Sequence, residues 1–156
     1  MFTDGVFGNT LRVPGGSRFD NKPHFPTLKA LQMANTVQYP FTQASTDNRR
    51  EHQGYGFPNV QSMWDNRGVM FIVDEEDVLV QGEGTSYTLN VPAGRSELRV
   101  SMSYADPAAN PAAAIARIND LTLRVISPSG TAYWGNAGLW DGNYCTAGGS
   151  RDTLNT

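Results

Sequence analysis

The oxygen-bearing side chains in the second half of the chain are the residues best suited to hold a metal ion. Asp106 precedes an Ala-rich segment, Asn119 and Asp120 follow that segment, and Asp141 lies further along. Calcium prefers clustered carboxylate and carbonyl oxygens supplied by loops. If the Ala-rich loop folds back, Asp106 would meet Asn119 and Asp120, which predicts a candidate calcium site at these positions, with Asp141 as a further ligand. The alternative is that Asp106 and Asn119 cap turns through bonds to the backbone.

Nucleophilic catalysis has less support. Cys145 is the single cysteine, so it forms no internal disulfide, and no local signature places a base beside it. His52 lies in a charged, Arg-rich loop, and His24 lies between Pro23 and Phe25. A catalytic base needs a nucleophile and a carboxylate within hydrogen-bond reach. We therefore expect both histidines to be solvated or structural, and we assign no catalytic residue and no organic cofactor.

The elements that would position the oxygen donors are expected to be β-strands. Residues 121–126 alternate with a period of two, a turn follows at residues 128–130, and a second strand starts at Thr131. Residues 98–104 alternate more strictly, with one apolar and one polar face. The apolar faces are expected to share one core, formed by Leu98, Val100, Met102, Leu121, Leu123 and Val125.

Helical patterning is confined to the first half. Residues 26–37 form the main predicted helix, because Pro26 suits a first turn and Ala30, Met33, Ala34 and Val37 have helical spacing. A short helix is expected at residues 60–65, with Met63 and Trp64 pointing inward. The acidic segment at residues 74–77 is expected to be a solvated face.

Composition limits the class of protein. The 156 residues include 16 Gly and 9 Pro, which favours short strands and turns over long helices. We therefore predict a mainly β fold, a loop-rich segment with one main α-helix followed by a β-sandwich. The net charge of −3 argues against nucleic-acid binding. No apolar run is long enough to cross a membrane, and the N-terminal residues do not form a signal peptide.

Several motifs, in order, resemble the C-terminal part of subtilisin-like serine proteases. Gly54-Tyr55-Gly56 with Asn59-Val60 resembles the Gly-Trp-Gly-x-x-Asn-Val that ends the catalytic core, and residues 26–36 resemble the last structural helix. Asp106-Pro107 resembles a Trp-Thr-Asp-Pro motif, although Tyr104 and Ala105 depart from it. Residues 119–131 resemble the central hairpin of the β-domain that follows the catalytic domain in many members.

The resemblance implies an organisation and a role. Residues 1–66 would be the C-terminal remnant of a catalytic domain, and residues 67–156 a jelly-roll β-domain, truncated in this chain. The β-domain would stabilise the protease or position its polypeptide substrate, with the upstream catalytic domain as its partner. The family also implies loop-bound calcium and secretion to an extracellular location.

The resemblance does not provide a catalytic triad. The family's catalytic Asp and His lie upstream of every matched segment. Gly84-Thr85-Ser86 repeats the letters of the family's nucleophile motif, but an alternating strand follows it where the family has a buried helix. We therefore expect the chain to be inactive alone and a non-catalytic fragment of a serine endopeptidase.

A function from another class is a stand-alone binding module for carbohydrate or protein, because jelly rolls serve in lectins. Aromatic rings could form its stacking platform, namely Tyr133, Trp134, Trp140 and Tyr144. A third interpretation is a structural product without activity. In addition, Met33, Val37 or Trp64 would be partly uncovered without a catalytic sheet, and such a patch could drive self-association.

Overall fold

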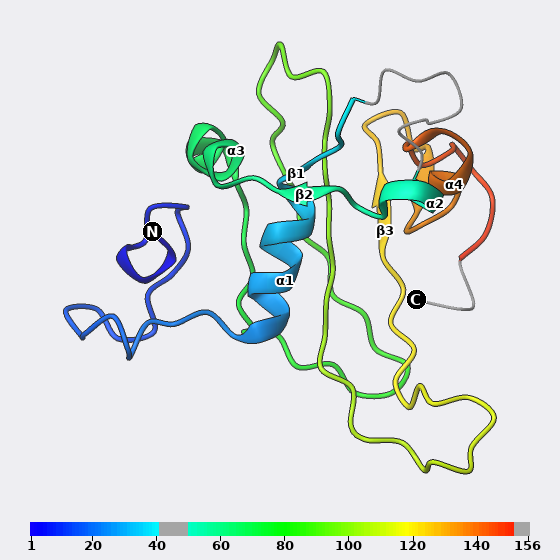
Figure 1. The fold of residues 1–156 in the computed structure, drawn as a ribbon, viewed down its shortest axis with the longest axis horizontal. Helices are drawn as coiled ribbons and strands as arrows, with labels where there is room; N and C mark the ends of the chain where they lie inside the picture. Colours follow the sequence, from blue (N-terminus) through cyan, green and yellow to red (C-terminus); the bar gives the residue numbers. More distant parts are fainter. Residues whose placement is uncertain (41–49, 152–156) are drawn as a thin grey trace. The chain divides into compact units, whose positions relative to one another are not determined.

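The computed structural model describes residues 1–40 and 50–151 (Figure 1). Regular elements in this part are short. The helices are α1 (Phe25–Ala34), α2 (Arg50–Gln53), α3 (Val60–Asp65) and α4 (Leu139–Gly142), with 3-10 helices at Phe2–Asp4 and Arg67–Val69. The strands are β1 (Thr36–Val37), β2 (Phe57–Pro58), β3 (Arg124–Ile126) and β4 (Ala132–Trp134). β1 and β2 form one two-stranded sheet, and β3 and β4 form another.

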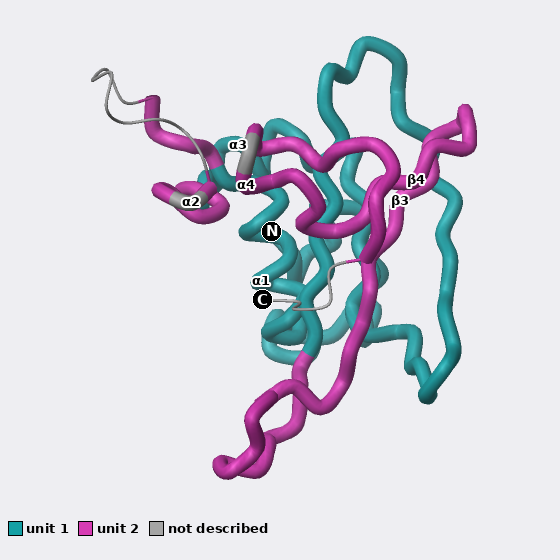
Figure 2. Tube along the Cα trace, turned by 90° about the vertical axis from the view of Figure 1, so that its right-hand side faces the viewer, with its two compact units in different colours: residues 1–36, 58–104 teal, residues 37–57, 105–156 magenta. Residues whose placement is uncertain are grey.

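The chain divides into two compact units, coloured separately in Figure 2. Unit 1 contains residues 1–36 and 58–104, and unit 2 contains residues 37–57 and 105–156. Each unit therefore combines sequence from both sides of residue 67, where the resemblance places a domain boundary. That boundary concerns the parent protein and stays a prediction.

The described hydrophobic core belongs to unit 1. Phe2, Phe7, Leu31 and Met63 are buried together, and the partly buried Met70 and Ile72 pack against them. The core thus joins the N-terminal segment, α1 and α3. Leu31 is the residue of α1 that lies in this core, and it is 8% exposed.

Helix α1 confirms the predicted helix but ends earlier than expected, at Ala34. Pro26 lies in the first turn and is fully buried. Past the helix, the Asn35 side chain donates to the Leu31 carbonyl at 2.9 Å, and the Thr36 hydroxyl donates to the Met33 carbonyl at 3.1 Å. These side chains satisfy carbonyls that the helix leaves open, so Thr36 and Val37 leave the helix and form β1.

Helix α3 forms where the sequence predicted it. The Asn59 side chain caps its first turn by accepting a hydrogen bond from the backbone N–H of Ser62 at 2.9 Å. Met63 is buried as expected. Trp64 is not, because it is 44% exposed and its ring lies 4.1 Å from the guanidinium carbon of Arg67.

The predicted hairpin in unit 2 is present. β3 and β4 pair antiparallel, with Arg124 opposite Trp134 and Val125 opposite Tyr133. The backbone N–H of Ser127 donates to the Thr131 carbonyl at 2.9 Å, which closes the turn. Gly130 has a φ of 84°, the left-handed conformation that the turn residues predicted.

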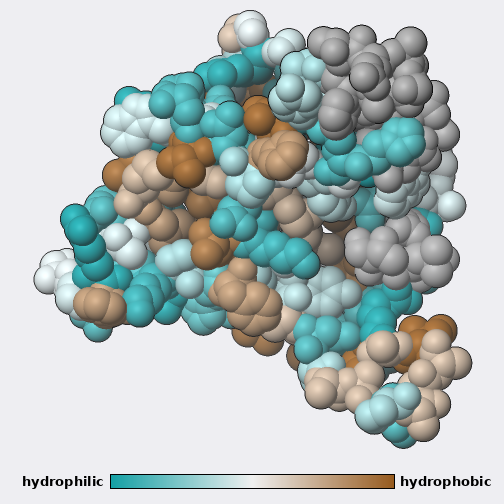
Figure 3. All heavy atoms as spheres, viewed as in Figure 1, coloured by the Kyte–Doolittle hydropathy of each residue, from teal (hydrophilic) through white to brown (hydrophobic). Residues whose placement is uncertain are grey.

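The mainly β prediction is only partly met. The described residues form a few short helices and two small sheets, and no closed sandwich occurs among them. Residues 98–104 form neither helix nor paired strand, and three residues expected in a core are exposed, namely Leu98 (49%), Val100 (39%) and Met102 (38%). No second sheet covers this alternating face in the described part. Figure 3 shows hydrophobic residues, in brown, on the face of the molecule that it draws.

The acidic segment at residues 74–77 is not simply a solvated face. The Asp74 side chain is only 7% exposed and forms an ion pair of 3.1 Å with Arg12. A carboxylate oxygen of Glu75 lies 2.6 Å from Nδ1 of His24. These contacts attach residues 74 and 75 to the segment that leads into α1, whereas Glu76 remains exposed, as expected for a solvated face.

Candidate functional site

The loop that was expected to hold calcium brings Asp106 and Asn119 together in unit 2. Oδ2 of Asp106 accepts a hydrogen bond of 2.7 Å from the backbone N–H of Ile118. Oδ1 accepts two hydrogen bonds from Asn119, one of 3.0 Å from its backbone N–H and one of 2.8 Å from its side-chain amide. The Ala-rich segment between them therefore forms a loop that Asp106 closes. This is the turn-capping alternative, and it occupies both carboxylate oxygens with donors.

These hydrogen bonds also set the electrostatics of Asp106. The bond from Ile118 has the largest effect, and with the two bonds from Asn119 and the charge of Arg117 it holds the pKa of Asp106 below its ordinary value. The carboxylate is thus ionised at neutral pH, the form that either a turn cap or a calcium ligand requires.

The other two predicted ligands are Asp120 and Asp141. Asp120 forms an ion pair of 3.5 Å with Arg117. Asp141 lies in helix α4, but its side chain is outside the described part of the structure. Among the described residues, no group of three His, Cys, Asp or Glu side chains could hold a metal ion. Calcium at Asp106, Asn119, Asp120 and Asp141 stays a prediction.

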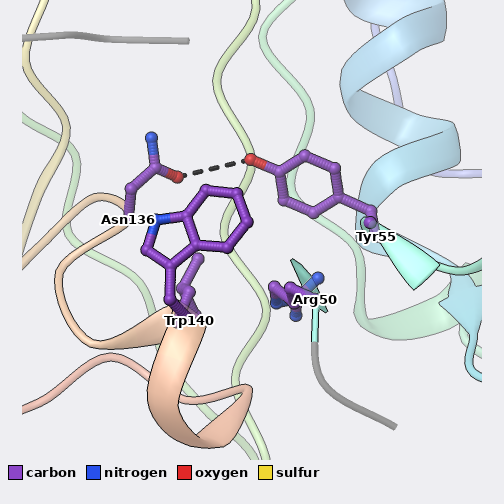
Figure 4. A pocket seen from close by; sticks show the side chains of 6 residues that line it. Arg50, Tyr55, Asn136 and Trp140 are labelled. Atoms are coloured by element: carbon purple, nitrogen blue, oxygen red, sulfur yellow. Dashed lines mark hydrogen bonds between the residues drawn. The ribbon is translucent and has the colours of Figure 1, made fainter. Parts of the chain in front are cut away.

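Unit 2 also contains a pocket of about 240 Å³. Its walls come from two parts of the chain, the α2 region and the segment from β4 to α4, and they are formed by Arg50, Gly54, Tyr55, Asn136, Leu139 and Trp140. Tyr55 and Asn136 point toward one another, and the Tyr55 hydroxyl donates to Oδ1 of Asn136 at 3.3 Å (Figure 4). The indole of Trp140 rises beside them from helix α4.

The turn at Gly54 and Gly56 positions Tyr55 in this pocket. Both glycines have positive φ angles, 58° and 96°. A Cβ on Gly56 would lie 2.5 Å from the carbonyl oxygen of Val37, so a larger residue would collide with that backbone. The sequence prediction of a close backbone turn is therefore confirmed, and its glycines have a physical reason.

Arg50 supplies the positive charge of the pocket. Its guanidinium carbon lies 5.0 Å from the centre of the Tyr55 ring, and Nη2 contacts the Asn143 carbonyl at 3.5 Å. Its Nε is buried and has no hydrogen-bond partner among the described residues. Burial raises the pKa of the neighbouring Cys145 thiol, while the charge of Arg50 and a bond from the Asn136 backbone oppose that shift.

The residues weighed as nucleophile or base have different surroundings. Ser86 is exposed, and residues 87–91, where an alternating strand was expected, form neither helix nor paired strand. His24 contacts Glu75, and His52 lies in α2 on an exposed position. Part of the expected aromatic platform is exposed, because Trp140 and Tyr144 are 56% and 66% exposed, whereas Tyr133 and Trp134 are half-buried.

Sequence reasoning did not find the pocket. The sequence indicated Tyr55 only as the centre of a Gly-aromatic-Gly turn and Trp140 only as a candidate stacking ring, and Arg50 was one residue of the Arg-rich loop around His52. Residues 50–55 and 136–140 are about eighty positions apart, and no pattern in either segment indicates the other. The one available signal was the Gly-aromatic-Gly turn, which predicts that an aromatic side chain is held in a fixed place.

No family model matches this sequence, and no curated protein and no solved structure matches it either. In the described residues, no helix has both the length and the apolar character needed to span a membrane.

Proposed function

We propose that the chain is a non-catalytic C-terminal part of a subtilisin-like serine endopeptidase. The observation that carries the proposal is the Gly54-Tyr55-Gly56 turn, the most specific of the matching motifs. The close approach of Gly56 to the Val37 backbone gives this motif a geometric requirement, which supports a true structural match over a coincidence of letters. The helix motif at residues 26–36 precedes it and the remaining motifs follow it, in the order that the family has.

In this proposal, residues 67–156 correspond to a jelly-roll β-domain that stabilises the catalytic domain or positions its polypeptide substrate. The exposed alternating row of Leu98, Val100 and Met102 supports it, because an apolar row of this kind is expected to pack against another layer. The proposed partner is the upstream catalytic domain. The same resemblance favours an extracellular location and calcium bound in loops of the β-domain.

The first test is the gene sequence upstream of the codon for Met1. An open frame encoding an Asp, a His and a Gly-Thr-Ser followed by a helix would support the proposal. An upstream frame that encodes an unrelated domain would contradict it.

The second test concerns activity of the chain itself. We expect neither hydrolysis of casein nor labelling by a serine-directed fluorophosphonate, because a serine hydroxyl without an adjacent base is a weak nucleophile. Ser86→Ala is the informative variant and Ser129→Ala is its matched control. Labelling that Ser86→Ala abolishes and Ser129→Ala preserves would show that the chain is catalytic.

A second candidate function is binding of carbohydrate, favoured by the exposed rings of Trp140 and Tyr144. Aromatic rings on a protein surface provide flat apolar faces for a sugar ring. Fluorescence titration with soluble oligosaccharides tests this function. Trp140→Ala and Tyr144→Ala should each weaken binding, whereas Trp64→Ala, which removes a comparably exposed indole from unit 1, should not.

A further inference from the structure

The geometry of the unit 2 pocket points to a site for a small aromatic carboxylate, and we propose this ligand class for it. The ring would lie in the apolar part of the pocket, beside Tyr55 and Trp140. The carboxylate would accept hydrogen bonds from Arg50. This inference does not depend on the relation to proteases.

The charge of the ligand follows from Arg50. A guanidinium presents five N–H donors in a planar fork that matches a carboxylate, and its partners in the described structure use few of them. Nη2 makes one long contact of 3.5 Å with a carbonyl, and Nε is buried without a partner. A buried N–H without an acceptor is unfavourable, so an incoming anion would gain a charge-assisted hydrogen bond. Among the described residues that line the pocket, none is a carboxylate that would already neutralise Arg50.

The residues that line the pocket indicate that the uncharged part of the ligand is a single apolar ring. Tyr55, Leu139 and Trp140 give the pocket an apolar lining, and Trp140 is 56% exposed. A volume of about 240 Å³ is below the usual range of drug-sized sites, so it suits a single ring. A phosphate dianion would be a poorer match, because the described residues that line the pocket supply one cation, the Arg50 guanidinium.

Asn136 provides a polar group on the opposite wall. Its side chain accepts the Tyr55 hydroxyl at 3.3 Å, which leaves its amide N–H groups as donors. A φ of 65° holds Asn136 in the left-handed conformation, an arrangement that Asn tolerates better than most residues. The Tyr55–Asn136 bond thereby fixes both side chains at the pocket before a ligand arrives.

The first experiment uses the unaltered protein and two probes. Phenylacetate carries the ring and the charge, and phenylacetamide is its neutral counterpart. We expect phenylacetate to bind at least tenfold more tightly in an NMR titration and to shift the indole N–H signal of Trp140, identified by its loss in Trp140→Phe. Equal affinity for the two probes, or no binding of phenylacetate, would overturn the proposal.

The second experiment alters the cation. Arg50→Met should reduce phenylacetate affinity at least tenfold, and Arg50→Lys should retain part of it, because lysine keeps the charge without the planar fork. Arg67→Met is the matched control, since Arg67 also lies over an aromatic ring but belongs to unit 1. Unchanged affinity in a folded Arg50→Met protein would contradict the assignment. A peptide ending in phenylalanine, compared with its C-terminal amide, distinguishes a peptide terminus from a free acid as the natural source of the carboxylate.

Discussion

The carboxylate of Asp74 accepts a hydrogen bond of 3.1 Å from the backbone N–H of His24, the residue that precedes helix α1. His24 itself makes no side-chain cap. Asp74 also accepts a bond from the Thr27 side chain in the first turn, so a residue from the second half of unit 1 caps the start of α1. A negative charge at this end complements the helix dipole.

The first prediction concerns this cap. Asp74→Asn keeps the shape of the side chain but removes the charge that faces Arg12 and the start of α1. Because Asp74 is nearly buried, we expect the variant to lose about 1–3 kcal/mol of unfolding free energy in urea. Glu76→Gln is the control, since Glu76 is exposed, and it should change stability by less than about 0.5 kcal/mol. Equal stability of the two variants would refute the capping role.

The second prediction is a pH dependence. Burial opposes ionisation of Asp74, but bonds from Thr27, His24 and Arg12 outweigh it, and the net effect is a pKa below the ordinary 3.8. A carboxyl group whose pKa is lowered by folding contributes its full stabilisation at pH values above its ordinary pKa. This contribution is lost as the pH falls through the pKa of the folded state. The difference in stability between the wild type and Asp74→Asn should therefore be largest at neutral pH and shrink below pH 3.8. A difference that stays constant in acid would contradict the charge-based account.

The third prediction tests the Gly-aromatic-Gly turn. Gly54→Ala places a side chain at a positive φ with no atom within 4 Å, so it should cost about 1–2 kcal/mol. In Gly56→Ala the new Cβ would also collide with the Val37 carbonyl, and the φ of 96° is less accessible to alanine than the φ of 58° at Gly54. Thermal unfolding should therefore show a clearly lower Tm for Gly56→Ala than for Gly54→Ala. The reverse order would mean that the close approach to Val37 is absent in solution.

Local chemistry explains which parts of the fold could be predicted. The hairpin around Gly130, helix α3 and the start of α1 depend on turn residues and caps that are adjacent in sequence. The role of Asp74 depends on a partner fifty positions away, and the pocket joins segments still further apart. Spacing within one segment carries no information about such contacts. The periodicity of residues 98–104 correctly excluded a helix, but it could not indicate whether a second layer would cover the apolar face.

The fourth prediction compares two aliphatic side chains. Val100 was expected in a core, where truncation to Ala would cost about 2–4 kcal/mol. Because Val100 is 39% exposed, we now expect Val100→Ala to cost less than about 1 kcal/mol, whereas Leu31→Ala should cost about 2–5 kcal/mol. Urea unfolding of both variants measures the difference. Equal losses would indicate that residues 98–102 are covered in solution, for example by self-association, which sedimentation of the same samples would reveal.

The last prediction separates the two roles of Asp106. If Asp106 only closes its loop, calcium will leave thermal unfolding of the chain unchanged, and Asp106→Asn will lower Tm equally with calcium or with a chelator present. If calcium binds at this position, the Asp106 carboxylate gives up hydrogen bonds from Asn119 to contact the ion. Added calcium will then raise the Tm of the wild type but not of Asp106→Asn. Asp77→Asn is the control, because it removes the same charge from unit 1. Since both oxygens of Asp106 already accept hydrogen bonds from residues 118 and 119, we expect the first outcome at low calcium and a calcium effect only at high concentration. A large rise in Tm at low calcium, lost in Asp106→Asn alone, would instead establish Asp106 as a ligand of a true calcium site.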